Sequence, residues 1–549
     1  MNRQKKSNRG VHLWLWNLAK RDVGFIILLT AAGGLLSLSY ILFALLSRQV
    51  INAATGGTPV WPQVTLLLGL LAFQGLLNIT YNHLSVYIVG RQEIRLRERI
   101  FCGLYKKKWQ SVSSYHSGDI LNRLTDDSTV ITGGITGLVP RAVSIFVRLS
   151  ASVAVLLALD AGFTFVLLTV GILVFIFSRI MGPRMKKMHK AVQQTEGKTR
   201  SFMQECVENW AAVQSFGGAD TLKPRFAFLQ KEHFRQTIRR NHFRNLANTA
   251  TVMAFSGAYC AALGWGAWQL ARGILDFGTM TAFLQIVNQI SIPFRNVSGL
   301  LPGYYNIVAS AERVMELEDL PGEEAAGSLP PVCVLEEIRA ENITFAYDKE
   351  PVLKEASIVI KAGEFVAFAG LSGIGKSTFL KLLMSFYQPL AGTLTVRLNG
   401  EDCPVTAAHR PLFSYVPQGN LILSGTVGQN IAFFEENVPE IKLWEAAQAA
   451  ELAEFIRSLP AGMNTEIGER GLGLSEGQTQ RLAIARALLR AAPVLLLDEA
   501  TAALDERTEA RVLENIRKLP DKTCICVSHR SAALAVCDRV VRIEQMKFD

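Results

Sequence analysis

The sequence predicts an α-helical membrane domain with six transmembrane helices, fused to an α/β domain. Three observations favour this fold class. Six apolar stretches occupy most of the first 300 residues, and a segment rich in proline, glycine and acidic residues follows them. Beyond it, short apolar runs alternate with helix-period segments, which is typical of a sheet covered by helices. A chain of 549 residues is also too long for one hydrophobic core.

Each predicted span supplies the roughly 20 residues that a helix needs to cross a bilayer. The six spans lie at residues 23–47, 64–88, 135–159, 163–181, 250–270 and 280–300. Ahead of them, residues 1–10 are basic and polar, and the next ten carry Trp14 and Trp16 among aliphatic side chains. Because tryptophan prefers the headgroup level of a membrane, we interpret this stretch as an interfacial helix rather than a cleaved signal peptide.

Lysine and arginine are concentrated in the connections that follow the second and fourth spans, whereas the other three connections hold almost none. By the positive-inside rule, the basic connections and both termini face the cytoplasm, and the protein is a multi-pass protein of the cytoplasmic (inner) membrane. The net charge of +10 is therefore largely topological, and no nucleic-acid partner is expected. Both basic connections are long and rich in helix formers, which predicts helices that project into the cytoplasm.

Domain boundaries follow from the change in composition. We place the membrane domain, with its interfacial and intracellular helices, at 1–318, a linker at 319–335 and the second domain at 336–549. None of the eight cysteines falls in a segment expected outside the cell, so no disulfide framework is expected. Cys524 and Cys526 alternate in an apolar strand run, and we interpret them as buried thiols rather than a metal pair.

Residues 370–377 read G-L-S-G-I-G-K-S, between an apolar strand-like run and a helix-period segment. This fits the P-loop pattern, in which backbone N–H groups and a helix N-terminus face a phosphate group. Lys376 is predicted to reach the β- and γ-phosphates of ATP and Ser377 to offer its hydroxyl to Mg²⁺. The second domain is thus predicted to be an α/β P-loop NTPase domain. Its ATP contacts in this loop are Gly370, Ser372, Gly373, Gly375, Lys376, Ser377 and Thr378.

A second phosphate-related motif lies about 120 residues later. The apolar run 494–497 reads as a buried parallel strand and ends in Asp498 and Glu499. Strands that end in acids are common, but this one follows a P-loop at a suitable distance. Asp498 is predicted to join the Mg²⁺ shell, and Glu499 to orient and polarise the attacking water.

Residues 474–478, L-S-E-G-Q, open another helix, with Ser475 in the N-cap position. Such a helix end can meet the γ-phosphate of a nucleotide held by another chain. With these three motifs the chain resembles the ABC transporters. The resemblance covers nearly the whole chain, in the arrangement of an exporter-class half-transporter with fused membrane and nucleotide-binding domains.

The resemblance implies roles for further residues. Tyr347 is similar to the aromatic residue that stacks on adenine, Gln418 to the Q-loop residue that contacts Mg²⁺, and His529 to the switch histidine near the γ-phosphate. The implied catalytic residues are Glu499 and His529. The other implied ATP contacts are Ser475, Gly477, Gln478 and Asp505, and the implied metal contacts are Ser377, Gln418 and Asp498.

Three features depart from the family pattern. Glu476 occupies the third place of the signature, where the family has glycine, and puts a carboxylate near the docking phosphate. Ala502 replaces a usual serine at the dimer seam. The chain ends at Asp549, so the usual C-terminal strands and helix are expected to be short or absent.

The resemblance implies ATP-driven export or flipping of an amphipathic substrate (lipid, peptide or drug-like) by alternating access. Two nucleotide domains would close head to tail over two ATP molecules, so a homodimer is expected. One half of a heterodimeric exporter remains an alternative, because of Glu476. An ATP-gated channel or sensor without productive transport is another. A soluble ATPase acting on nucleic acid and an importer are disfavoured, because the membrane and nucleotide domains share one chain.

Charged residues inside the spans indicate a cargo cavity. Arg141 and Arg148 share a face of the third span, and Arg295 lies towards the inner end of the sixth. A charge that faces lipid costs at least ~2.5 kcal/mol, so such residues normally face the bundle interior. Arg141 and Arg295 can instead reach the headgroups. We assign Arg148, Arg295, Gln285 and Asn288 to a cavity that suits an amphipathic, anionic cargo such as a lipid or an acidic peptide.

Overall fold

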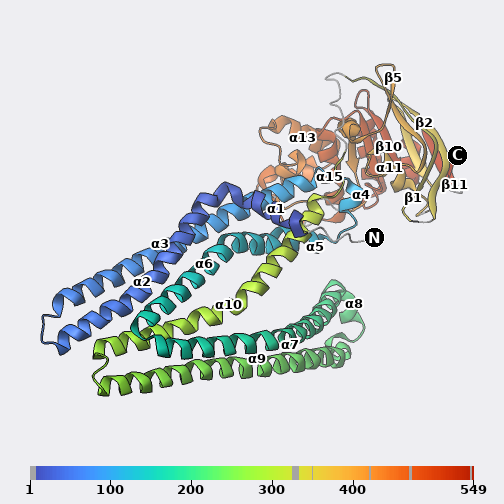
Figure 1. Ribbon diagram of the computed structural model, residues 1–549. Coiled ribbons are helices and arrows are strands. Elements are labelled where there is room, and N and C mark those ends of the chain that lie inside the picture. The colour runs from blue at the N-terminus through green and yellow to red at the C-terminus, as the bar shows by residue number, and fades with distance from the viewer. Residues whose placement is uncertain are drawn as a thin grey trace. The chain divides into compact units, whose positions relative to one another are not determined.

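The computed structural model describes residues 8–323, 333–348, 350–371, 373–419, 422–468, 473–544 and 547–548. The chain divides into two compact units, a helical one and one that contains the strands (Figure 1). The first unit comprises Met1–Gly103 and Ser117–Asp319, and the second comprises Leu104–His116 and Leu320–Asp549. Residues 324–332 of the predicted linker, and Ser372 of the P-loop, lie outside the described residues.

Within its described residues, the first unit consists of helices and the turns between them. They are α1 (Asn8–Ala19), η1 (Lys20–Asp22), α2 (Val23–Thr55), α3 (Trp61–Leu104), α5 (Ser117–Asn122), η2 (Arg123–Asp127), α6 (Ser128–Leu159), α7 (Ala161–Glu208), α8 (Trp210–Ser215), α9 (Gly218–Ala271) and α10 (Phe277–Glu318). Five helical stretches among the described residues are long and apolar enough to cross a membrane. The sixth predicted span lies in α10, which has 42 residues. The helices are therefore roughly consistent with six spans in a multi-pass membrane protein.

Two sets of helices are visible in the first unit. Helix α6 packs against both α2 and α10, and α10 also contacts α2. Helices α7 and α9 lie side by side over most of their length, and α8 lies between them in the chain (Figure 1). At 48 and 54 residues, α7 and α9 are far longer than a bilayer crossing requires.

Acidic side chains tie the helices together at both ends of this unit. Asp160 caps α7 by accepting a hydrogen bond from the Phe163 backbone N–H at 2.9 Å. Its other oxygen accepts from the Trp265 indole at 2.9 Å and the Gln269 amide at 2.6 Å, both on α9. At the opposite end, the buried Asp127 pairs with Arg313 of α10. Polar contacts as well as packing therefore fix the positions of α9 and α10 along the helices that they contact.

The second unit contains two main sheets. The six-stranded sheet has the order β12-β11-β3-β10-β9-β6, in which all neighbours are parallel except the β11–β12 pair. Its strands are β3 (Phe365–Ala369), β6 (Phe413–Val416), β9 (Val494–Asp498), β10 (Thr523–Val527), β11 (Arg539–Glu544) and β12 (Lys547–Phe548). The antiparallel sheet, ordered β2-β1-β4-β5, consists of β1 (Leu335–Ala346), β2 (Pro351–Lys361), β4 (Ala391–Leu398) and β5 (Glu401–Pro404).

Helices alternate with the strands along this unit, as the sequence pattern predicts. They are α11 (Lys376–Leu383), α12 (Val427–Ala432), α13 (Glu440–Ala449), α14 (Ala453–Ser458), α15 (Glu476–Leu489), α16 (Glu506–Arg517) and α17 (Ser531–Val536). Of these, α11, α15 and α17 contact the parallel sheet. Every residue of β9 and β10 is buried, including Cys524 and Cys526, and both thiols are free. Because parallel strands end at the same edge, the segments after β3, β6, β9 and β10 meet there.

A short segment between the helices α3 and α5 groups with the second unit. It contains α4 (Trp109–Val112), and Lys107 forms an isolated bridge with Gly322. The Trp109 ring lies 5.2 Å from the Phe386 ring, between centroids. Composition alone assigned this segment to the membrane domain. Its contacts are made with residues more than 200 positions later in the chain, and composition does not reveal them.

Candidate nucleotide site

The P-loop is held in a conformation that requires glycine. Strand β3 is buried and ends at Ala369, after which Gly370, Gly373 and Gly375 have φ values of +146°, +84° and +115°. A side chain at Gly375 would also come within 3.0 Å of the Val352 carbonyl oxygen. Helix α11 begins at the next residue, so its unpaired N–H groups point at the loop. The loop and the helix end together form an anion cradle.

Two P-loop side chains make defined contacts. The Lys376 ammonium donates to the carbonyl oxygens of Gly370 and Leu371 at 2.7 and 2.8 Å, which places it across the loop. The Ser377 hydroxyl donates to Oδ1 of Asp498 at 2.6 Å, so the residues that the sequence assigned to Mg²⁺ do meet. Serine and carboxylate oxygens this close together form the hard oxygen donor set that Mg²⁺ prefers.

Asp498 is the most constrained group of the site. Its side chain is 1% exposed, and burial raises its pKa above the ordinary value, while the hydrogen bonds from Ser377 and Tyr415 act in the opposite direction. The Tyr415 hydroxyl donates to Oδ2 of Asp498 at 3.1 Å. Sequence reasoning missed Tyr415. The sequence feature that could have identified Tyr415 is its position on β6, three residues before Gln418.

Glu499 follows directly on the same strand end. Its backbone has a φ of +51°, which is uncommon for a residue with a side chain. The Gln418 amide donates to Oε2 of Glu499 at 2.6 Å. The structure therefore brings together Ser377, Asp498, Glu499 and Gln418, and His529 follows the adjacent strand β10 with an exposed side chain.

Tyr347 lies beside the P-loop helix. Its hydroxyl is 3.1 Å from the Thr378 hydroxyl, and its ring is edge-on to Phe345 and Tyr387 at centroid distances of 5.0 and 5.2 Å. The side chain is 49% exposed, so ring surface remains accessible to a flat ligand such as adenine.

The signature segment forms a separate helix end. Ser475 caps α15 through a reciprocal capping box with Gln478, with bonds of 3.3 and 2.8 Å. Ser475 and Glu476 are both exposed. Gly477 closely approaches the Ala503 carbonyl oxygen, which a Cβ would meet at 3.0 Å. The described contacts of this helix end therefore run to the segment before Asp505 rather than to the chain's own P-loop.

A buried ion pair lies behind the Asp505 segment. Glu509 of α16 is fully buried, accepts from the Thr501 hydroxyl at 2.7 Å and pairs with Arg530 at 3.0 Å. Arg530 also donates to the Leu504 carbonyl oxygen at 2.5 Å. Because Arg530 directly follows His529, this pair connects the switch histidine to the residues before Asp505. Sequence reasoning missed it, since Glu509 and Arg530 belong to no short motif.

The predicted cargo residues lie in the helical unit, where Arg148 and Gln289 each contact Tyr40. The Arg148 guanidinium stands 4.8 Å from the centre of the Tyr40 ring, and the Gln289 amide donates to the Tyr40 carbonyl oxygen at 2.9 Å. Gln285 has a buried side-chain oxygen without a hydrogen-bond partner in the described structure, and Asn288 is exposed. The side chain of Arg295 lies outside the described residues.

Comparisons with known proteins agree with this geometry. The chain matches the family model of the ABC transporter transmembrane region over residues 23–294 and that of the ABC transporter over residues 353–502. It is similar to an ATP-dependent lipid A-core flippase of Methylobacillus flagellatus, with 32% identity over 87% of this chain and 82% of the relative. A flippase of the same name from Chromobacterium violaceum is 30% identical over the same shares.

A solved structure is similar over nearly the whole length. It is that of a bacterial Atm1-family ABC exporter with ATP bound, at a TM-score of 0.79 and 25% identity, and the match covers 96% of this chain and 94% of the other.

The ion pair behind Asp505 generates a stability prediction. Replacing Arg530 by glutamine leaves the buried Glu509 without its cation, which is expected to destabilise the second unit by about 3 kcal/mol. The measurement is thermal unfolding of the purified protein in detergent. Arg507→Gln, on the exposed side of α16, is the matched control and should melt like the parent. Equal melting of the Arg530 and Arg507 variants would contradict the proposed importance of the pair.

Proposed function

This chain belongs to the ABC transporter family as an exporter-class half-transporter and transport ATPase, and from that premise we propose that it exports or flips an amphipathic, anionic substrate across the cytoplasmic membrane. The observation that carries the proposal is the contact of Ser377 with Asp498 next to the Gln418–Glu499 pair, in a chain whose other half crosses the membrane. These residues are those that ATP hydrolysis requires, and the helices are those that a membrane pathway requires.

Each residue of the nucleotide site has a proposed part. Lys376 and the backbone N–H groups of the P-loop bind the phosphates, while Ser377, Asp498 and Gln418 hold Mg²⁺. Magnesium, when bound, supplies charge neutralisation at the phosphate oxygens. Glu499 accepts the hydrogen bond of the attacking water and takes up its proton, and the Gln418 amide keeps that carboxylate in position. His529 is the candidate for a contact to the γ-phosphate.

The exposed end of α15 supports a site shared between two chains. Ser475 and Glu476 are exposed and contact no P-loop residue in the described structure, yet the capping box keeps the helix end in a phosphate-binding form. We propose that this end of a second copy completes each ATP site. We also propose that both termini are cytoplasmic, as the distribution of lysine and arginine predicts.

Two observations support an anionic amphipathic cargo. Two relatives with about 30% identity are lipid A-core flippases by name. In this chain, Arg148 is half-buried against Tyr40, and Gln285 and Gln289 each present a buried side-chain oxygen without a described partner. Buried cations and amides within spans normally face a bundle interior or a watery pathway.

The hydrolysis step is tested by Glu499→Gln. Removal of the carboxylate is expected to keep ATP binding but to slow hydrolysis by at least ~100-fold, because the water loses its general base. The measurement is phosphate release together with retention of labelled ATP. Glu506→Gln, an exposed acid seven residues later, should hydrolyse like the parent. Hydrolysis by Glu499→Gln at near the parent rate would exclude the proposed role of Glu499.

The homodimer is tested by expressing this chain alone. We expect a dimer mass in detergent, ATPase activity, and a more persistent dimer for Glu499→Gln with ATP, because unhydrolysed nucleotide bridges both chains. Mass photometry and ATPase assays measure these properties. A monomer without activity would instead favour a heterodimer, in which Glu476 marks the weaker of two unequal sites.

The cargo cavity is tested by Arg148→Ala. We expect the variant to lose most of the ATPase stimulation that anionic amphiphiles give the parent, while basal activity is retained, because the cation lies away from the nucleotide site in sequence and unit. Arg141→Ala, seven residues earlier on α6 and exposed, is the matched control. Unchanged stimulation of the Arg148 variant by every such amphiphile would remove the reason for preferring an anionic cargo.

A further inference from the structure

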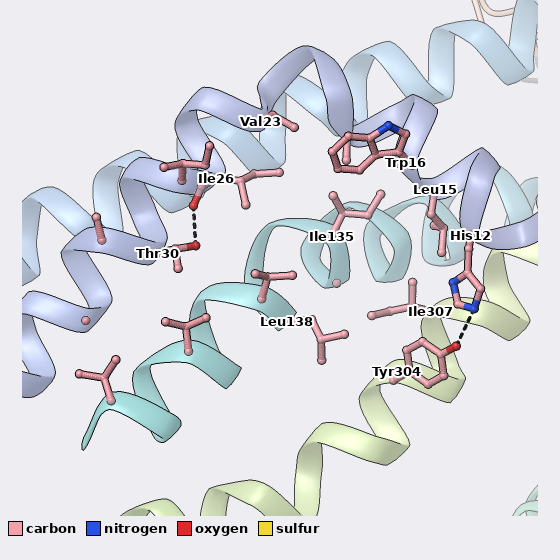
Figure 2. Close-up of a pocket in the computed structure, with 18 of the residues that line it drawn as sticks. His12, Leu15, Trp16, Val23, Ile26, Thr30, Ile135, Leu138, Tyr304 and Ile307 are labelled. Carbon is pink, nitrogen blue, oxygen red and sulfur yellow. Dashed lines mark hydrogen bonds between the residues drawn. The ribbon is translucent and has the colours of Figure 1, made fainter. Parts of the chain in front are cut away.

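A large apolar cavity lies in the first unit between α1, α2, α6 and α10. Its volume is about 900 Å³, within the range of sites for small-molecule ligands. Figure 2 shows side chains of α2 and α6 pointing into an open space, with Trp16 of α1 above it and Ile307 of α10 at one end. Neither Arg148 nor Gln285 lines this cavity, so it is a different site from the one proposed for the cargo.

Apart from the Trp16 indole N–H, the polar side-chain groups of the cavity have described hydrogen-bond partners. His12 and Tyr304 form a hydrogen bond of 2.9 Å with each other, and the Thr30 hydroxyl donates to the Ile26 carbonyl oxygen of its own helix at 2.7 Å (Figure 2). The remaining lining residues are aliphatic, aromatic or glycine. Apart from that N–H, a ligand inside the cavity meets apolar surface, which favours a hydrocarbon chain over a polar group.

The shape of the cavity fits such a chain. Along α2 the lining extends from Val23 to Leu38, which is roughly 22 Å at the helical rise. One leaflet of a bilayer has a hydrocarbon thickness of about 15 Å. In the predicted orientation, the Val23 end lies at the cytoplasmic surface. The cavity is thus long enough for an acyl chain that enters from the cytoplasmic leaflet.

Two basic residues are neighbours of the cavity lining in the chain. Lys20 and Arg21 are exposed and lie between the lining residues Ala19 and Val23. The neighbouring acid does not cancel them, because Asp22 is buried and occupied by Arg95 and Gln92. Basic side chains at the membrane surface attract anionic headgroups by roughly 1 kcal/mol each.

We propose that this cavity binds an anionic phospholipid of the cytoplasmic leaflet, with an acyl chain between α2 and α6 and the headgroup at Lys20 and Arg21. Helix α1 forms one wall and is anchored to α10, because the Trp14 indole donates to Glu318 at 2.7 Å and His12 pairs with Tyr304. The lipid would therefore fix the N-terminal helix against the bundle. The site is independent of the proposed cargo, and its occupancy can be measured without transport.

Gly34 offers a direct test, because it lines the cavity and a Cβ there meets no atom within 4 Å. Delipidated full-length protein is titrated with phosphatidylglycerol or with phosphatidylcholine of the same chains, and native mass spectrometry counts bound lipid. Gly34→Leu fills the cavity and is expected to weaken phosphatidylglycerol binding at least about tenfold. Gly24→Leu, on the same helix but outside the lining, is the matched control and also has open space for its side chain.

The headgroup contact is tested by Lys20→Gln combined with Arg21→Gln. This variant is expected to lose the preference for phosphatidylglycerol, about fivefold per charge, while binding phosphatidylcholine like the parent. Equal lipid counts for Gly34→Leu and Gly24→Leu would overturn the site. A loss of dimer mass in Gly34→Leu with unchanged lipid counts would also overturn it, because the cavity would then be a contact between copies of this chain.

Discussion

The nucleotide-binding unit depends on one buried carboxylate at the edge of a parallel sheet. Asp498 is almost fully enclosed, yet both of its oxygens accept hydrogen bonds, from Ser377 of the P-loop and from Tyr415 of β6. An enclosed acid is tolerable only with such partners or with a cation. The same group therefore links three strand ends, and it is the carboxylate that we propose as a ligand of Mg²⁺.

A second buried acid, Glu509, joins the segments around this edge of the sheet through polar contacts. Glu509 holds Thr501 and Arg530, and Arg530 holds the carbonyl oxygen of Leu504. Arg530, which follows His529 in the chain, thus shares a single polar junction with the segment before Asp505 and with helix α16. On the other side, the Ala503 backbone N–H donates to Gln480 of α15 at 2.9 Å. The start of α15 is therefore linked to the segment that contains Arg530 through residues 503 and 504.

Much of this arrangement could be predicted from the sequence, because phosphate binding imposes short local patterns. The P-loop, the acidic strand end and the capped signature helix each lie within a few consecutive residues, and the helical spans follow from apolar length alone. Tyr415 and the Arg530–Glu509 pair could not be found in that way, since their partners are 21 to 83 residues distant. The cavity beside α1 was missed for the same reason, because four separated helices supply its walls.

Glu476, which stands where the family has glycine, has two opposing electrostatic effects at the start of α15. The Glu476 carboxylate lies in the first turn of α15, where its attraction to the helix dipole stabilises the helix by about 0.3–1 kcal/mol. A phosphate charge 4 Å away would oppose it by about 4 kcal/mol at the effective dielectric of a protein surface. The repulsion therefore outweighs the attraction to the helix dipole. Because the side chain is exposed, it can relieve this repulsion by turning to solvent, which leaves Ser475 and the backbone N–H groups of the helix end for the proposed phosphate contact. The proposed closure of two chains therefore selects one rotamer of Glu476 and does not require its replacement.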